Sequence, residues 1–482
     1  MTKIMLINPP WYILQGSSLS EIPIGLSYLA SFLKEKGRQV EVFNADFGSP
    51  KYVGYKSLYE SYSAYLACLN NLEDNIWQGI IKEVEEYKPD IVGLTLKTGA
   101  YKSACNIACL IKRYFPRVII VAGGPHATIL PQETAQEGCF DYVVKGEGEI
   151  TFLELIERIE KDESLEEVKG LTYFKNGKII DNPARHFIEE LDNLPFLERD
   201  SHLHRKQYSP DTISLIITGR GCPYACTFCA SEKIWKRKVR FRSPFNIVDE
   251  INIVYKKYGS RHFKFRDDTF TLNKQRALEI CELLIRQKLP ITWQCETRAD
   301  CLDEELVRKM KEAGCIGVSI GVESGSERIL KYIEKGETKE KIAEGIKLLR
   351  KFGINVSTFM MIGFPTETEE EMEETMKFVK KLSPNHIILS ILTPYPGTKI
   401  YDDSLRLGLL KDDSFWEGWF HQSPEMGIAE NKERFRKLAQ RYLREIETYN
   451  TSIWRKIIKL SSQMLRNRYI IVRKVRKIWK KR

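Results

Sequence analysis

Gly219-Arg220-Gly221-Cys222-Pro223-Tyr224-Ala225-Cys226-Thr227-Phe228-Cys229-Ala230 is the stretch of sequence that decides the fold. It places three of the eleven cysteines within eight residues, with the spacing C-x3-C-x2-C. The apolar run at residues 213–218 comes directly before it and predicts a buried strand. Three thiols on a tight loop after a strand suit a soft metal: iron in an iron–sulfur cluster, zinc or copper(I).

The alternatives to a cluster are a zinc knuckle or three buried thiols. A zinc site usually pairs C-x2-C with a second, distant cysteine pair, and none is present. No fourth cysteine lies near the loop in the sequence, so a four-iron cluster would leave one iron open to a small molecule.

This pattern, with an aromatic residue before the third cysteine, resembles the radical S-adenosylmethionine (SAM) enzymes. The resemblance implies a [4Fe–4S] cluster on Cys222, Cys226 and Cys229, with Phe228 beside SAM. SAM would chelate the fourth iron and be cleaved to a 5′-deoxyadenosyl radical.

The second half of the chain alternates strands and helices and is predicted to form a domain at residues 207–410. Strands are expected at residues 213–218, 262–265, 291–294, 316–320, 355–361 and 387–392. Six such units match the partial (β/α)6 barrel of radical SAM enzymes. Barrel chemistry lies at the carboxyl ends of the strands.

The segments after these strands supply the SAM contacts that the resemblance implies. Asp268, chosen over Asp267, would contact the amino group, Arg298 the carboxylate and Glu323 the ribose diol. The turn with Gly363, Pro365 and Thr366 would meet adenine and ribose. Each segment alone is more often a surface ion pair or a turn, but together with the loop at residues 393–398 they lie in register behind the cysteines.

Residues 1–160 are predicted to form a doubly wound, Rossmann-like parallel sheet. Strands are expected at residues 3–8, 40–43, 90–96, 118–122 and 141–145, with helices at 24–36, 101–114 and 152–161 and over most of 51–87. Ligands of such sheets bind beyond the carboxyl ends of the strands. No G-x-G-x-x-G follows the first strand, so a nicotinamide or flavin site is weakly supported.

This half resembles the cobalamin-binding domain that precedes the radical SAM domain in one large subfamily. The match rests on the Asn8-Pro9-Pro10 start, residues 23–30 and 88–94, and the motifs at 123–126 and 146–149. The cobalamin contacts it implies are Pro10, Thr95, Thr98, Gly123, Gly124, His126, Gly146, Glu147, Gly148 and Glu149. The D-x-H-x-x-G motif that supplies a cobalt ligand is absent, so a protein histidine is not expected on cobalt. The alternative is a domain that has lost its cofactor, with these residues serving turns and caps.

The remaining segments are a linker and a tail. Residues 161–206 are expected to be a linker with a hairpin around Asn176-Gly177. Residues 411–482 are expected to be a helical extension outside the barrel, with an aromatic cluster at 415–420 that packs on the barrel or closes its mouth. From residue 453 the apolar spacing and basic opposite face predict an interfacial amphipathic helix. A membrane surface is the favoured partner of residues 451–482, ahead of the protein's own body, and nucleic acid is the least favoured.

Composition and length limit the possible domain number, compartment and membrane topology. The 482 residues carry a net charge of +10, yet residues 448–482 hold twelve basic and no acidic side chains, leaving 63 basic against 65 acidic elsewhere. The length predicts two or three domains. Eleven cysteines and no recognisable secretory signal indicate a reducing, cytoplasmic compartment, with a peripheral position on the membrane's inner face suggested by the tail. No apolar run approaches the roughly 20 residues of a spanning helix.

These features predict an enzyme that resembles the cobalamin-dependent (class B) radical SAM enzymes. The leading hypothesis is C-methylation of an unactivated carbon in a lipid or secondary metabolite, using methylcobalamin and reduced by flavodoxin or ferredoxin. A cyclase or rearrangement enzyme is the main alternative, an RNA methylthiotransferase is less favoured, and a non-catalytic scaffold would require a vestigial cysteine loop. No catalytic base is identified; Tyr395 and Glu296 are only nearby candidates.

Overall fold

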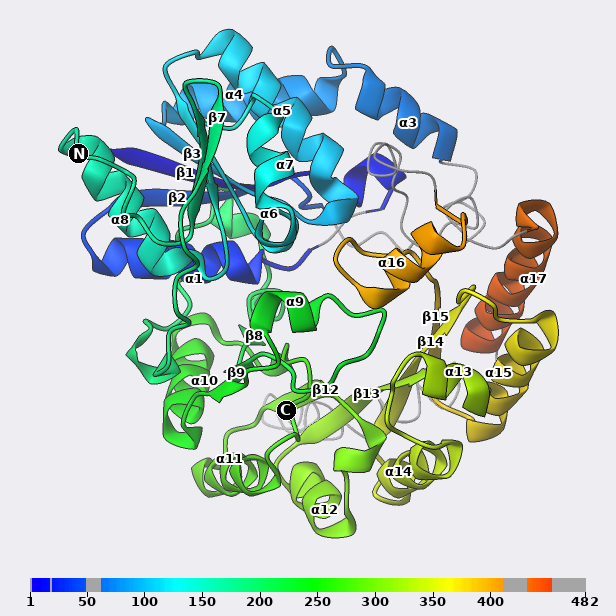
Figure 1. The fold of residues 1–482 in the computed structure, drawn as a ribbon. Helices are drawn as coiled ribbons and strands as arrows, with labels where there is room; N and C mark the ends of the chain where they lie inside the picture. Colours follow the sequence, from blue (N-terminus) through cyan, green and yellow to red (C-terminus); the bar gives the residue numbers. More distant parts are fainter. Residues whose placement is uncertain (1, 18–19, 49–61, 411–430, 453–482) are drawn as a thin grey trace, which may run out of the picture.

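The structure is a computed structural model that describes residues 2–17, 20–48, 62–410 and 431–452. Two α/β halves lie against each other, each built around its own sheet (Figure 1). The amino-terminal sheet has the order β2-β1-β3-β4-β5-β6-β7, and the second sheet has the order β15-β14-β13-β12-β11-β8. The predicted fold class, a doubly wound domain followed by a partial barrel, is confirmed.

The first sheet begins with five parallel strands. They are β1 (Lys3–Asn8), β2 (Gln39–Asn44), β3 (Ile91–Thr95), β4 (Ile119–Gly123) and β5 (Tyr142–Val144). Helices α1 (Ile24–Glu35), α3 (Tyr62–Asn70), α4 (Asn75–Tyr87), α5 (Tyr101–Tyr114), α6 (Pro125–Ile129), α7 (Pro131–Gln136) and α8 (Gly148–Glu160) belong to this half. Each strand expected in this half is present, with its ends offset by at most one or two residues.

Both faces of this sheet are buried, which explains its nearly continuous apolar strands. On β1, Ile4 and Leu6 pack with α1 and α8, whereas Met5 and Ile7 pack with α4 and α5. Successive side chains of a strand point to opposite faces, so one short run serves two cores.

The hairpin in the expected linker extends the first sheet. Strands β6 (Leu171–Lys175) and β7 (Lys178–Asp181) are antiparallel, and β6 pairs with β5. Asn176 and Gly177 both have positive φ, as a two-residue hairpin turn requires. Short 3-10 turns at Leu191–Asn193 and Arg205–Gln207 interrupt the remaining path to the second half.

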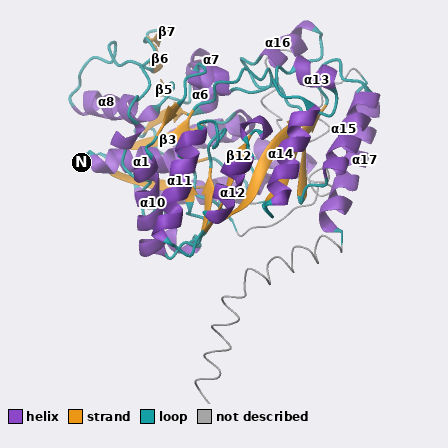
Figure 2. Ribbon diagram, turned by 90° about the horizontal axis from the view of Figure 1, so that it is seen from below, coloured by secondary structure: helices purple, strands orange, loops and turns teal. Residues whose placement is uncertain are grey.

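The second sheet consists of six parallel strands that curve as a partial barrel. They are β8 (Leu215–Ile216), β11 (His262–Phe265), β12 (Thr292–Thr297), β13 (Cys315–Glu323), β14 (Asn355–Ile362) and β15 (His386–Ile391). Helices α10 (Pro244–Tyr258), α11 (Lys274–Gln287), α12 (Glu304–Glu312), α13 (Glu327–Tyr332), α14 (Lys339–Lys351), α15 (Glu369–Leu382) and α16 (Lys399–Arg406) accompany them, and they surround the strands in Figure 2.

Helix α17 (Lys432–Thr451) is part of the helical extension expected beyond residue 410, and it packs directly on the barrel. Phe435, Ala439, Tyr442, Leu443 and Ile446 are buried in the same core as the barrel strands. These apolar residues recur every three or four positions, the spacing of one helix face. Charged and polar residues fill the positions between them, so the segment does not stand out in the sequence as part of a core.

The aromatic cluster at residues 415–420 and the amphipathic pattern from residue 453 lie outside the described residues, as do residues 51–61 of the expected helical region. Among the described helices, none has the length and apolar character needed to cross a membrane.

Candidate functional site

The cysteine loop (residues 219–230) follows β8 and is held from both sides. Its first residues form β9 (Gly219–Arg220), which pairs with β10 (Arg240–Phe241) beyond the short helix α9 (Ser231–Trp235). Gly221 has φ +97°, and a Cβ there would lie 2.0 Å from the carbonyl oxygen of Lys238. Only glycine therefore permits this turn.

The cysteine loop is also anchored at its centre. The Thr227 amide donates a hydrogen bond to the Ile333 carbonyl at 3.0 Å, and the Ile400 amide donates to the Thr227 carbonyl at 3.1 Å. These backbone bonds join the loop to the segment after α13 and to the start of α16, so the fold fixes its path.

All three loop cysteines carry free thiols. Burial raises the pKa of Cys222 and Cys226, and it raises that of Cys229 to about 12. The charges of Cys222 and Cys226 contribute to the shift of Cys229, as expected for neighbouring thiols. Within the described residues, the side-chain positions as they stand bring no three His, Cys, Asp or Glu groups within ligating distance, these cysteines included.

The two aspartates after β11 differ in their surroundings. Asp267 is buried and accepts hydrogen bonds from the amides of Thr218 and Gly219, at 2.7 and 2.6 Å. Asp268 faces the cleft between the two halves and accepts a hydrogen bond from the Ser231 hydroxyl at 3.0 Å. Burial raises the pKa of both carboxyls. Asp268 is therefore the one available to a ligand.

Arg298 has partners other than the predicted SAM carboxylate. Its Nε and Nη2 donate to Asp300 at 3.0 and 2.8 Å, and its Nη1 donates to the Lys335 carbonyl at 2.8 Å. The guanidinium also lies 3.7 Å from the ring centre of Tyr224, within the cysteine loop. The Tyr224 hydroxyl in turn lies 3.5 Å from Cys301 Sγ, so the fold brings near the loop a fourth cysteine that is distant in sequence.

Glu323 ends β13 with a buried carboxylate and φ +59°. Lys335 Nζ lies 3.5 Å from Glu323 and 3.3 Å from Glu337, and it is itself buried. Burial raises the pKa of Glu323, and Lys335 opposes that shift. Sequence reasoning missed Lys335, because it sits in an ordinary charged stretch after α13 and carries no motif.

The turn at residues 363–366 is held by the carboxylate of Glu367, the residue that follows it. Glu367 accepts the amides of Gly363 and Phe364 at 2.7 and 3.1 Å, and burial raises its pKa to about 8. Thr368 caps α15 and forms a capping box with Glu371. Phe364 also meets Phe228 of the cysteine loop edge-on, with ring centres 6.4 Å apart.

A cavity of about 300 Å³ lies at the carboxyl edge of the first sheet and extends to the barrel mouth. Seven of the predicted cobalamin residues line it: Thr95, Gly123, Gly124, Gly146, Glu147, Gly148 and Glu149. Asp268 and Arg220 line it from the other half of the molecule. Gly25 and Gly146 have open space where a Cβ would stand, so these two glycines keep room in its wall.

Pro10, Thr98 and His126 do not line this cavity. His126 is buried, with Nδ1 3.2 Å from the Thr98 hydroxyl and its ring 4.3 Å from that of Tyr101. Burial lowers the pKa of His126 to about 4. These surroundings match the alternative that His126 serves the helix start after β4.

Glu147 and Glu149 line the cavity, yet their carboxylates bind arginines of the second half. Arg220 pairs with both glutamates, at 2.7 Å to Glu149, and Arg240 pairs with Glu147 at 2.8 Å. The carboxylates that were predicted to contact cobalamin are therefore already engaged in ion pairs that join the two halves.

Comparison with known proteins supports both halves. The Radical SAM superfamily model matches residues 216–379, and the B12 binding domain model matches residues 17–156. An uncharacterised methyltransferase of Pyrococcus horikoshii is 36% identical over 417 residues, covering 85% of this chain and 84% of the relative. The chain belongs to the B12-binding radical SAM family.

Two further similarities agree with that family. An anaerobic magnesium-protoporphyrin IX monomethyl ester cyclase of Rubrivivax gelatinosus is 31% identical over 419 residues, 83% of this chain and 70% of the relative. The fold matches that of the radical SAM methyltransferase TsrM from Kitasatospora setae with a TM-score of 0.68 and 20% identity, over 86% of this chain and 80% of that one.

The chain is accordingly a methyltransferase-like radical SAM enzyme whose cofactors are a [4Fe–4S] cluster, SAM and cobalamin. The residues present are compatible with these groups. Three free thiols lie on one anchored loop, and thiolates are the ligands of iron–sulfur clusters. The glycine-lined cavity provides room at the sheet edge where such domains bind ligands.

Proposed function

We propose that this enzyme methylates an unactivated carbon of a lipid or secondary metabolite. The observation that carries the proposal is the shared cavity, whose wall combines Gly123, Gly124 and Gly146 of one half with Asp268 and Arg220 of the other. When bound, the reduced cluster with SAM supplies a 5′-deoxyadenosyl radical and cobalamin supplies a methyl group. A cavity that reaches both sites lets one substrate meet both reagents.

The cysteine loop would hold the cluster through Cys222, Cys226 and Cys229. Phe228, Asp268, Glu323 and the turn at Gly363, Pro365 and Thr366 would then surround SAM. Asp268 offers a carboxylate to a cationic amino group, and Glu323 offers one to a diol. The chain's task is to orient the cofactors and exclude water, since the cofactors carry the difficult chemistry.

For the SAM carboxylate, we favour Lys335 over the predicted Arg298. Both cations have carboxylate neighbours, but Arg298 binds Asp300 through two hydrogen bonds at 3.0 and 2.8 Å. The Lys335 ammonium lies at the longer distances of 3.5 and 3.3 Å from Glu323 and Glu337, and it is near Cys226. Lys335 is buried, and its positive charge stabilises a nearby carboxylate more strongly there than in water.

The cobalamin would occupy the 300 Å³ cavity and extend from it toward the barrel mouth. The cofactor would contact Thr95, Gly123, Gly124, Gly146 and Gly148 in the cavity wall. No role on cobalt is proposed for His126, in agreement with the missing D-x-H-x-x-G motif.

The lipid part of the proposal rests on the basic, amphipathic composition of residues 451–482. Twelve basic and no acidic residues in 448–482 favour an anionic membrane surface, and we propose a cytoplasmic enzyme that binds it peripherally. The electron required by the cluster would come from a small carrier such as flavodoxin or ferredoxin.

A first test is anaerobic reconstitution with iron, sulfide and hydroxocobalamin, followed by methyl-labelled SAM and a chemical reductant. We expect near four irons and one cobalt per chain, S-adenosylhomocysteine, and label in the cobalamin fraction. Addition of a membrane lipid extract should then move label into product. Production of 5′-deoxyadenosine without S-adenosylhomocysteine would contradict methylation.

Ring closure without methyl transfer is the second candidate, since the relative from Rubrivivax gelatinosus is named a cyclase. That function predicts cobalt and iron in the same amounts but no labelled product with any acceptor. The labelled-SAM experiment therefore separates the two functions.

A further inference from the structure

Arg220, at the start of the cysteine loop, lies beside Arg240 of the strand that pairs with it. Arg220 of β9 and Arg240 of β10 are direct partners in the antiparallel register. Like charges opposite each other on a sheet repel. These two are tolerated because the start of α8 in the other half supplies carboxylates: Glu147, the N-cap residue, pairs with both arginines, and Glu149, in the first turn, pairs with Arg220.

The resulting network is almost fully buried. The side chains of Arg240, Glu147, Glu149 and Arg220 are 4%, 5%, 7% and 11% exposed. Glu147 also accepts the Ile188 amide at 2.8 Å. Burial alone would lower the pKa of Arg220, but Glu149 and Glu147 outweigh it and raise that pKa. The glutamates therefore stabilise the charged arginine, and removing one member leaves a buried charge without its partner.

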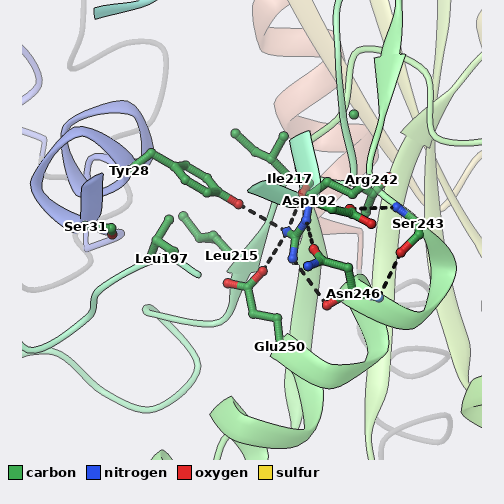
Figure 3. A network of polar contacts seen from close by, with 12 residues as sticks. Tyr28, Ser31, Asp192, Leu197, Leu215, Ile217, Arg242, Ser243, Asn246 and Glu250 are labelled. Atoms are coloured by element: carbon green, nitrogen blue, oxygen red, sulfur yellow. Dashed lines mark hydrogen bonds and ion pairs between the residues drawn. The ribbon is translucent and has the colours of Figure 1, made fainter. Parts of the chain in front are cut away.

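Tyr28 of α1 connects this network to a second one. Its ring lies 5.6 Å beneath the Arg220 guanidinium, and its hydroxyl accepts a hydrogen bond from Arg242 at 3.3 Å. Arg242 pairs with the fully buried Glu250 at 2.6 Å, as Figure 3 shows. Tyr28 thereby joins the first half to two arginines of the second.

Arg220 belongs to the cysteine loop and also lines the cavity, so its ion pairs connect the two. Arg220 stands two residues before Cys222, while Gly146, Glu147, Gly148 and Glu149 line the cavity. These buried ion pairs therefore join the loop that carries the cluster cysteines to the start of α8, which borders the cobalamin cavity.

We propose that Arg220 is a positioning residue that couples the two cofactor sites. The loop backbone is already anchored, but its three thiols as they stand are not within ligating distance, so loading the cluster must draw them together and restrain Cys222. The Arg220–Glu147–Glu149 link passes that restraint to the cavity wall. Cobalamin then binds a wall that is already ordered and loses less conformational entropy, which is positive cooperativity. The proposal rests on the proposed function only in requiring that both cofactors bind these sites.

The test measures the dissociation constant of hydroxocobalamin by equilibrium dialysis, without turnover. It compares the iron-free and cluster-reconstituted full chain for the wild type, Arg220→Gln and the control Arg158→Gln. Arg158 lies on α8 and pairs with glutamates of its own half. We expect cluster loading to tighten cobalamin binding about fivefold or more in the wild type and control. In Arg220→Gln the ratio of the two dissociation constants, iron-free over cluster-loaded, should fall to near one.

The ratio separates coupling from other roles of Arg220. If Arg220→Gln weakens cobalamin equally in both states, the arginine merely contacts the cofactor or supports the fold, and the proposal is wrong. A wild-type ratio of one also overturns it. Absence of cobalamin binding by the wild type in either state defeats the proposed function as well. Should Arg220→Gln not fold, the conservative Arg220→Lys and the partner variant Glu149→Gln are judged by the same ratio.

Discussion

Asp267 and Asp268 are adjacent in sequence and carry the same side chain, yet one is structural and the other accessible. Asp267 receives the amides of Thr218 and Gly219, which fixes the start of the cysteine loop. Asp268 lines the cleft and accepts a hydrogen bond from the Ser231 hydroxyl. The preference for Asp268 as the SAM residue stays a prediction, and this geometry supports it.

Asp268→Asn should weaken SAM binding about tenfold or more, because a charge-assisted hydrogen bond is lost. Its unfolding free energy should change by less than about 1 kcal/mol. Asp267→Asn should bind SAM like the wild type. Its free energy of unfolding should fall by about 1–3 kcal/mol, because a buried, hydrogen-bonded carboxylate is altered. Isothermal titration with SAM and denaturant unfolding measure both. Equal SAM affinities in wild type and Asp268→Asn would remove Asp268 from the site.

The raised pKa of Glu367 should make the free energy of unfolding depend on pH. Burial raises its pKa in the folded protein to about 8 from an ordinary 4.5. The stabilising neutral form is therefore fully present below pH 4.5, and its contribution is lost as pH rises from 4.5 to about 8. Glu367→Gln cannot ionise, so its stability relative to wild type should rise between pH 6 and 8 by on the order of 2 kcal/mol.

Urea unfolding of both proteins at pH 6 and pH 8 gives this difference directly. Glu374→Gln is a suitable control, because Glu374 lies on α15 in an exposed pair with Lys339. An identical pH dependence in wild type and Glu367→Gln would show that Glu367 ionises normally in the folded protein.

At the scale of elements, α17 explains how a segment far along the chain reaches the turn at residues 363–366. Phe435 of α17 lies beneath Gly363, where an added Cβ would be 2.8 Å from the ring. Gly363 also has φ +88°, which disfavours a side chain. The turn and the helix are therefore packed as one unit, although α17 follows the six barrel strands.

Gly363→Ala should cost the backbone strain and force the Phe435 ring and α17 to move. Gly259→Ala is the matched control, since Gly259 has φ +71° and open space around its Cβ position. We expect Gly363→Ala to lose at least about 1 kcal/mol more than the control and to weaken SAM binding several-fold. Thermal unfolding and SAM titration measure both effects; equal losses in the two variants would contradict the packing argument.

At the scale of the whole molecule, the cavity exists because the two halves meet at the carboxyl edge of the first sheet. Gly25 of α1 keeps part of this space open, whereas Gly79 of α4 is exposed on the outer surface. At either helix position an added Cβ would have no atom within 4 Å, so both glycines can accept the start of a side chain.

Gly25→Leu should reduce hydroxocobalamin affinity about tenfold or more by occupying the cavity, while iron content stays at four per chain after reconstitution. Gly79→Leu should bind cobalamin like the wild type. Equilibrium dialysis and iron analysis measure both. Unchanged cobalamin binding by Gly25→Leu would place the cofactor elsewhere.

The sequence alone determined the two α/β halves, the six barrel strands and the cysteine loop, because strand and helix periodicities and the C-x3-C-x2-C spacing are local properties. It also predicted seven of the residues that line the cavity, since glycines directly after strands mark the ligand edge of a parallel sheet. Only the tertiary structure decided the partners of charged side chains. The sequence could not show that Arg298 is held by Asp300, that Lys335 faces Glu323, or that Glu147 and Glu149 bind Arg220, because each depends on segments brought together by folding. The role of α17 was decided in the same way, since its apolar face gains meaning only where the barrel offers a surface to cover.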